Sequence, residues 1–203
     1  MGRSRRTPAG RPARIRIIGG AWRRRWLPVP GVGGLRPTAD ALRETLFNWL
    51  QPQLPGARVL DLFAGTGALG LEAASRGADT VLLVERDARA AAQLQANCES
   101  LGAGQVTVRR DDARRMLGES PPDGLAFDLV LVDPPFGKGH VPPVLEALLA
   151  RGWLHADSQV YVEIEAEADL AFIAAGGWQV ERERQGGQAR ALLLAQGVPD
   201  ARA

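Results

Sequence analysis

The chain has 203 residues, 45% of them apolar, which is enough to form one domain with a substantial core. No run of about 18 apolar residues is present, so we expect no membrane-spanning helix, and the basic N-terminus lacks the apolar segment of a secretory signal. The single cysteine, Cys98, excludes an internal disulfide and suits a reducing cytoplasm. Two histidines and one cysteine far apart in the sequence give no metal-ligand pattern, so we expect no metal.

Positive charge is concentrated at the N-terminus. Ten arginines and no acidic residue precede Asp40, which leaves 15 basic against 23 acidic residues in the remainder. Such segregation predicts that a polyanion, most simply a nucleic acid, docks at the N-terminal end. We expect residues 1–13 to be a disordered basic tail and residues 14–34 an RNA-binding extension. A catalytic domain is expected over residues 35–196, followed by a short tail over 197–203.

The RNA-binding extension has the pattern of a basic β-hairpin. Arg14–Ile18 has strand character, two glycines mark a turn, and a second strand is expected over Trp22–Val29. Aromatic residues alternating with arginines suit RNA, because rings stack on bases and guanidinium groups hold phosphates. Trp22 and Trp26 have two open interpretations, contact with RNA or packing onto the main domain, and packing is favoured for one of them. The residues expected to contact RNA are Arg16, Trp22, Arg23, Arg24, Arg25, Arg36 and Lys138.

The rest of the chain predicts an α/β fold. After a glycine-rich link, a helix is expected from near Ala39 to Leu50, with Thr38 able to cap it. Strand and helix patterns then alternate with short links, which is typical of a parallel sheet flanked by helices. The expected architecture is Rossmann-like, with a seven-stranded, mostly parallel sheet, an antiparallel last strand, helices on both faces and the basic hairpin at the N-terminus. The expected strands are Arg58–Leu62, Thr80–Val84, Val106–Arg109, Phe127–Val132, Gln159–Ile164, Trp178–Gln185 and Gln188–Ala195, and the expected helices are Ala68–Arg76, Ala88–Leu101, Ala113–Leu117, Pro142–Arg151 and Glu167–Ala175.

A glycine-rich loop follows the first strand of the predicted sheet. Residues 65–70 match G-x-G-x-x-G, a pattern that lets backbone approach a ligand but that nicotinamide enzymes share. Asp61, ahead of the glycines, is placed to hold the ammonium group of S-adenosylmethionine, whereas Glu85 would bind ribose in either cofactor. A third contact is expected at Asp111-Asp112-Ala113, after the third strand, where an acid and a backbone amide could read adenine edges. We therefore expect S-adenosylmethionine as the cofactor, held by Asp61, Phe63, Ala64, Gly65, Gly67, Glu85, Arg86, Asp112, Ala113 and Thr38.

A second candidate site is the buried strand that ends in Asp133-Pro134-Pro135-Phe136. Neither proline donates a backbone hydrogen bond and each has a fixed φ, so the loop is stiff. Such a loop would hold a carboxylate, free carbonyls and an aromatic face against a flat ring that carries an amino group. Taken alone, the motif is equally consistent with a stiff turn in which Asp133 is only solvated. Glu163 and Glu165 are assigned to a strand end and the surface.

Four segments resemble the RsmD family of bacterial 16S ribosomal RNA (guanine-N2)-methyltransferases, which are class I S-adenosylmethionine-dependent enzymes. They are Arg16–Arg23, Leu27–Pro30, Leu35–Thr38 and Arg43–Leu50, and the resemblance covers roughly residues 14–195. Arg24 and Trp26 depart from the family pattern, which has Gly and Lys at these positions.

The resemblance implies methylation of one guanine N2, conventionally numbered 966, in 16S RNA of the assembling small subunit. We also expect a cytoplasmic monomer. The resemblance also implies that Asp133 and the Pro134 carbonyl accept the two N–H bonds of the amine. Phe136 would stack on the extruded base, as enzymes that act on bases generally require.

Three alternatives remain. A DNA adenine-N6 methyltransferase uses the same acceptor motif, but only about 40 residues precede the first helix, which leaves little room for a target-recognition region. A nonenzymatic RNA-binding assembly factor is disfavoured by the presence of Asp61, Glu85 and Asp133. A nicotinamide dehydrogenase lacks an evident proton donor near the fourth strand.

Overall fold

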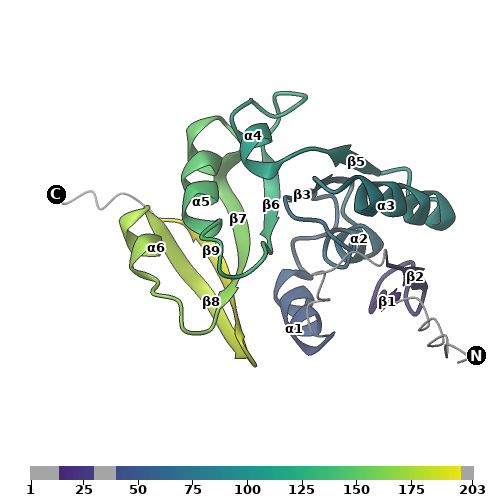
Figure 1. The fold of residues 1–203 in the computed structure, drawn as a ribbon, viewed down its shortest axis with the longest axis horizontal. Coiled ribbons are helices and arrows are strands. Elements are labelled where there is room, and N and C mark those ends of the chain that lie inside the picture. The colour runs from purple at the N-terminus through teal and green to yellow at the C-terminus, as the bar shows by residue number, and fades with distance from the viewer. Residues whose placement is uncertain (1–13, 30–39, 198–203) are drawn as a thin grey trace, which may run out of the picture.

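The computed structural model describes residues 14–29 and 40–197, and this part of the chain has the α/β architecture that the sequence predicts. The main sheet has seven strands in the order β5-β4-β3-β6-β7-β9-β8 (Figure 1). β9 runs antiparallel to both β7 and β8, and the remaining neighbours are parallel, so the expected antiparallel last strand is confirmed.

The strands of this sheet are β3 (Arg58–Asp61), β4 (Thr80–Glu85), β5 (Val106–Arg110), β6 (Phe127–Val132), β7 (Leu154–Glu165), β8 (Trp178–Gly186) and β9 (Ala189–Gln196). The helices are α1 (Asp40–Leu50), α2 (Gly70–Ser75), α3 (Ala88–Leu101), α4 (Ala113–Leu117), α5 (Val141–Ala150) and α6 (Ala171–Ala175).

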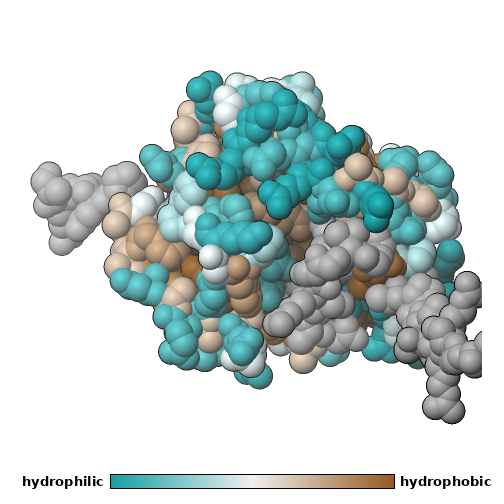
Figure 2. All heavy atoms as spheres, in the orientation of Figure 1, coloured by the Kyte–Doolittle hydropathy of each residue, from teal (hydrophilic) through white to brown (hydrophobic). Residues whose placement is uncertain are grey.

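Two hydrophobic clusters lie on opposite faces of the sheet, because successive residues of a strand point to opposite sides. Val59 of β3 belongs to one cluster and its neighbour Leu60 to the other. The first cluster includes residues of α1, α2, α3 and the N-terminal hairpin, and the second includes residues of α4, α5 and α6. Figure 2 shows one side of the resulting molecule, which is largely hydrophilic, with apolar residues gathered over α6.

The strand register brings the candidate site residues to one edge of the sheet. Asp61 at the end of β3 pairs with Leu131 of β6, and Val132 pairs with Val162 of β7. Asp133 therefore follows directly beyond the paired part of β6. Ligands of open α/β sheets bind at the carboxyl ends of the strands, which is where these acids lie.

The N-terminal hairpin is shorter than expected, with β1 at Arg14–Arg16 and β2 at Trp26–Pro28. The start of the strand expected over Trp22–Val29 is wrong, because the chain turns here and Arg25 N donates to the Trp22 carbonyl at 3.0 Å. Trp22 packs partly buried against the first cluster, whereas Trp26 is 57% exposed. One tryptophan therefore packs on the main domain, which is the interpretation that the sequence favoured.

Helix α2 holds this turn through the carboxylate of Glu72, which is completely buried. The carboxylate accepts hydrogen bonds from the backbone N–H groups of Ile18 and Gly19, both at 2.7 Å. It also pairs with Arg76 Nε at 2.7 Å. A buried charge is tolerated only when it is paired and hydrogen-bonded in this way. The hairpin is thus fixed to the sheet domain by backbone hydrogen bonds to a buried carboxylate.

Ser75, at the end of α2, adds a second attachment. Its hydroxyl donates to the Gly19 carbonyl at 2.6 Å and accepts from Trp22 N at 2.9 Å. A Cβ at Gly20 would lie 1.8 Å from the Ser75 carbonyl oxygen, so the close approach requires glycine.

Most boundaries in the main sheet domain lie within two residues of those expected, and two differ by more. β7 begins at Leu154, earlier than expected. Its pairing with β6 shifts register between Phe127 and Leu129, and there the Ser158 hydroxyl holds the two strands together by donating to the Phe127 carbonyl at 2.7 Å. α6 begins later than expected because the side chain of Asp169 accepts from Ala171 N at 2.9 Å. The expected N-terminal tail, residues 198–203 of the expected C-terminal tail, the glycine-rich link, Arg36 and the Thr38 cap lie outside the described residues.

Among the helices of residues 40–197, none has the length and apolar character needed to cross a bilayer.

Replacing Glu72 with glutamine should lower the free energy of unfolding by about 2–3 kcal/mol, because the amide keeps the size of the side chain but turns one acceptor into a donor. Urea denaturation measures this change, and hydrogen exchange of the Ile18 and Gly19 amides should become faster. Glu146→Gln on the exposed surface of α5 is the matched control. Equal stability of the two variants would contradict the role given to Glu72.

Candidate functional site

Asp61 ends β3 and is only 1% exposed. Its Oδ2 accepts a hydrogen bond from Gly70 N at 3.0 Å, while its Oδ1 is buried and has no partner among the described residues. Burial raises the pKa of Asp61 from 3.8 to about 7, with further increases from the charges of Asp133 and Glu85 and opposing hydrogen bonds from the Gly70 and Phe63 amides. A buried carboxylate oxygen without a partner is suited to accept from a cationic N–H donor.

The glycine loop makes a tight turn between Asp61 and α2. Gly65 and Gly67 have φ angles of 50° and 81°, in the left-handed region that favours glycine, and Gly67 N donates to the Ala64 carbonyl at 2.6 Å. A Cβ at Gly70 would lie 2.2 Å from a methyl group of Leu83. The loop backbone is therefore held close to the end of β3.

Glu85 ends β4 and supports the same loop. Its Oε2 accepts from Gly65 N at 2.9 Å and its Oε1 from Asp87 N at 2.6 Å. Each carboxylate oxygen retains a second lone pair, and the side chain is half-buried. Arg86 beside it is exposed. Glu85 therefore lies next to the glycine loop. Its contact with a ribose remains a prediction.

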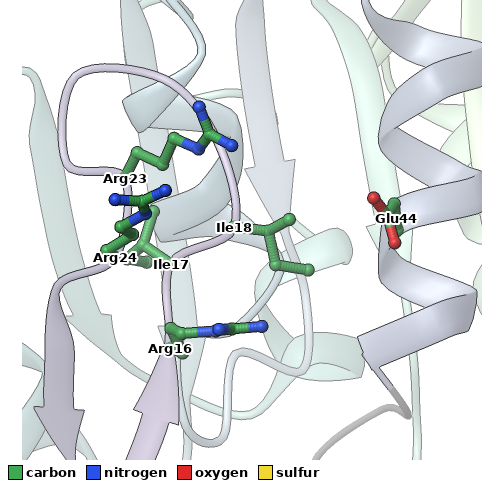
Figure 3. Close-up of a pocket in the computed structure, with 6 residues that line it drawn as sticks. All are labelled: Arg16, Ile17, Ile18, Arg23, Arg24 and Glu44. Atoms are coloured by element: carbon green, nitrogen blue, oxygen red, sulfur yellow. The ribbon is translucent and has the colours of Figure 1, made fainter.

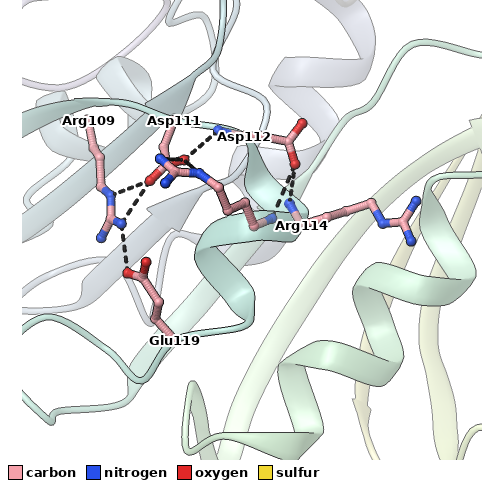
Figure 4. Close-up of polar contacts among 6 residues, drawn as sticks. Arg109, Asp111, Asp112, Arg114 and Glu119 are labelled. Atoms are coloured by element: carbon pink, nitrogen blue, oxygen red, sulfur yellow. Dashed lines mark hydrogen bonds and ion pairs between the residues drawn. The ribbon is translucent and has the colours of Figure 1, made fainter.

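Asp112 and Ala113 begin α4, where Asp112 Oδ1 caps the helix by accepting from two backbone N–H groups of the first turn, at 3.0 and 3.2 Å. The buried acid is Asp111, which pairs with Arg109 at 2.8 Å and Arg115 at 2.5 Å (Figure 4). Burial opposes ionisation of Asp111, but the hydrogen bonds from the two arginines and from Asp112 N outweigh it and lower its pKa. Sequence reasoning missed this network. The adenine contacts of residues 112 and 113 remain a prediction.

The acceptor loop follows β6. Asp133 is half-buried and Pro134 buried, Pro135 is exposed, and Phe136 is 39% exposed. Glu165 at the end of β7 accepts a hydrogen bond from Gly137 N and so fixes the far side of the loop. A small cavity of about 30 Å³ lies between this loop and the end of β7. The stiff, partly exposed loop expected from the two prolines is therefore present.

An aromatic contact joins the two loops. The rings of Phe63, in the glycine loop, and His140, after the acceptor motif, have centroids 5.8 Å apart. Lys138, which lies between the acceptor motif and His140 in the sequence, is exposed. The contact places the glycine loop and the acceptor loop side by side.

Two residues of β7 were not recognised as part of this region. Glu163 lies near the end of β7, as expected, but it is only 6% exposed and accepts a hydrogen bond from the Tyr161 hydroxyl at 3.1 Å. Burial, with the nearby charges of Glu163 and Asp133, raises the pKa of Tyr161 well above its ordinary value. The available sequence signal was an acid inside the apolar run of a central strand, since a buried strand rarely carries a charge without a polar purpose.

The hairpin presents the arginines expected to contact RNA. Arg16, Arg23 and Arg24 are exposed and line a cavity of about 260 Å³ with Ile17, Ile18 and Glu44 (Figure 3). Arg25 is turned to the main domain, where its Nη2 donates to the Ser100 carbonyl at 3.2 Å. The structure thus brings three of the expected arginines together and separates the fourth.

The residues around Asp61 fit a ligand that carries a cationic N–H group. No group of three or more histidine, cysteine or acidic side chains within residues 14–29 and 40–197 is arranged to hold a metal ion. In contrast, the buried Oδ1 of Asp61 lies among acids, so an ammonium group would supply its missing hydrogen bond and offset the surrounding negative charge.

Four matches to known proteins are consistent with one another. A family model described as Conserved hypothetical protein 95 matches residues 15–195. The chain is 45% identical over 190 residues to Ribosomal RNA small subunit methyltransferase D of Escherichia coli K12, covering 92% of this chain and 94% of that protein. A relative of the same name from Haemophilus influenzae is 39% identical and covers 85% and 89%. A solved structure of an Escherichia coli protein matches with a TM-score of 0.81 and 42% identity, covering 92% of this chain and 100% of that one.

The raised pKa of Asp61 predicts how stability depends on pH without a ligand. Between the ordinary value of 3.8 and about 7, the folded state keeps a proton that the unfolded chain has lost, so stability falls as pH rises through this window. The difference in free energy of unfolding between Asp61→Asn and the wild type should therefore favour the variant by about 2–3 kcal/mol more at pH 8 than at pH 5. Urea denaturation at both values measures this, with the exposed Asp79→Asn as the control. A pH-independent difference would contradict the burial effect.

Proposed function

The chain belongs to the family described as Conserved hypothetical protein 95, and from this premise we propose that it methylates RNA of the small ribosomal subunit. The proposed target is the exocyclic N2 of one guanine, conventionally numbered 966 in 16S RNA. The proposed methyl donor is S-adenosylmethionine. The family match confirms the resemblance found in the sequence, and the relatives named for this activity cover most of the chain.

The observation that carries the cofactor proposal is the buried Oδ1 of Asp61, which lacks a partner among the described residues. An ammonium group placed there would complete its hydrogen bonding. The neighbouring charges of Asp133 and Glu85 favour a ligand with net positive charge. S-adenosylmethionine has both an ammonium and a sulfonium group, whereas a nicotinamide dinucleotide brings two negative phosphates to the same acids.

The acceptor loop supplies the remaining chemistry. When bound, S-adenosylmethionine supplies a methyl group that is already activated on sulfur. Guanine N2 is a poor nucleophile because its lone pair is delocalised into the ring. Asp133 and the Pro134 carbonyl would accept its two N–H bonds and so orient the lone pair, while the exposed ring of Phe136 stacks on the base. Glu165 keeps the loop in place through Gly137 N.

S-adenosylmethionine should bind more weakly at low pH. Its ammonium group requires ionised Asp61, whose pKa of about 7 leaves the carboxyl protonated below that value in the free protein. Affinity should therefore fall by about tenfold for each pH unit below 7. Calorimetry in buffers of different ionisation enthalpy should detect proton release near pH 6. Binding of NAD in place of S-adenosylmethionine would refute the cofactor proposal.

Asp133→Ala should lower methyl transfer by on the order of 10²-fold or more while leaving S-adenosylmethionine affinity nearly unchanged, because the acceptor of the amine is lost. Transfer of labelled methyl groups to small-subunit RNA and calorimetric binding are the two measurements. Asp133→Asn, which keeps one oxygen acceptor, should retain part of the activity. Full transfer by the alanine variant would exclude this role for Asp133.

A further inference from the structure

The cavity lined by Arg16, Arg23 and Arg24 has the volume, charge and access to solvent that a ligand-binding site needs. Its volume of about 260 Å³ corresponds to roughly nine water molecules, which is enough for a phosphate and a ribose. Figure 3 shows the three arginines on the hairpin and Glu44 on α1, the acidic member of the lining. All four charged side chains are exposed, so a ligand from solvent can reach them.

The hairpin side of the cavity is rigid. Arg43 of α1, 1% exposed, donates from Nη2 to the Arg16 carbonyl at 3.0 Å, and Asn97 of α3 donates to the Pro28 carbonyl at 3.1 Å. Together with the contacts of Glu72, these bonds fix the backbone from which the arginines extend. Guanidinium groups on a fixed backbone lose less conformational freedom on binding than those of a mobile tail.

Arg24 has an unfavourable backbone conformation. Its φ of 69° lies in the left-handed region, and it is the one residue other than glycine with a positive φ in the described chain. Its N–H donates to the Ile17 carbonyl at 2.9 Å, which closes the turn. A side chain in this conformation costs roughly 1 kcal/mol compared with glycine. Strain of this kind is common at binding surfaces.

We propose that this cavity binds one ribonucleotide unit of the substrate RNA, with the phosphate held by Arg16, Arg23 and Arg24 and the ribose 2′-hydroxyl donating to Glu44. Three guanidinium groups supply the donors that a phosphodiester requires. A single carboxylate among them would repel a phosphate but accept from a hydroxyl, so it suits the sugar. The 2′-hydroxyl is the group that distinguishes RNA from DNA.

Trp26 extends the same surface. Its ring is 57% exposed, and the guanidinium of Arg16 lies 5.8 Å from the ring centroid. An exposed ring next to a phosphate site provides a stacking position for an adjacent base. This proposal rests on the proposed function, which gives RNA as the substrate. It adds the place where one nucleotide binds and the contact that selects RNA over DNA.

The test uses the full-length protein and a single-stranded RNA of about 20 nucleotides with a DNA of the same sequence, so that binding is measured without methyl transfer. Arg24→Gly should weaken RNA binding about tenfold and reduce the slope of log affinity against log salt by about 0.7. It should also raise the thermal unfolding midpoint by about 2–4 °C, because the strain is removed. Arg24→Gln, which keeps the strain, should lose affinity equally without the gain in stability. Arg89→Gln on the exposed surface of α3 is the control.

Glu44→Ala tests the ribose contact. This variant should bind DNA more tightly and discriminate less between RNA and DNA, because a negative charge and the acceptor of the 2′-hydroxyl are both lost. An unchanged salt slope in both Arg24 variants would overturn the phosphate site, and an unchanged RNA preference in Glu44→Ala would overturn the ribose contact. If these variants behave as expected but no methyl transfer to ribosomal RNA occurs, the proposed function fails while the nucleotide site stands.

Discussion

The hydrogen bond from Gly70 N to the buried carboxylate of Asp61 is the contact on which the rest of the site depends. It fixes the start of α2 against the end of β3 and leaves the other carboxylate oxygen for a ligand. From this start α2 continues to Glu72 and Ser75, which hold the N-terminal hairpin. One six-residue helix therefore connects the proposed methyl-donor site with the surface proposed to bind RNA.

The site is arranged at the expense of stability. Asp61 is buried near other acids, and its raised pKa shows that ionisation there is unfavourable in the folded chain. Arg24 has a positive φ that glycine would adopt more easily. Both features lie where a ligand of opposite charge is proposed to bind, a cation at Asp61 and a phosphate at Arg24. Functional sites commonly retain unfavourable electrostatics or strain that bound ligand relieves.

The sequence predicted the sheet, its antiparallel last strand and the convergence of the acidic residues, because hydrophobic alternation and glycine loops are local signals. It could not predict contacts between distant segments. Glu72 looks like any acid on a short helix, and only the docked hairpin shows that its carboxylate is buried. Trp22 was expected to begin a strand, but its N–H donates to the hydroxyl of Ser75, 53 positions away. The burial of Glu163 could not be predicted, because the sequence does not show which elements cover the end of β7.

Methyl transfer to guanine N2 in small-subunit RNA is the activity that we propose for this site. The most direct measurement is to map N2-methylguanine in 16S RNA from cells with the gene, without it, and with the gene carrying Asp133→Ala. We expect one N2-methylguanine that is lost in cells without the gene, returns with the intact copy and stays absent or strongly reduced with the variant. An unchanged N2-methylguanine pattern in cells without the gene would contradict it.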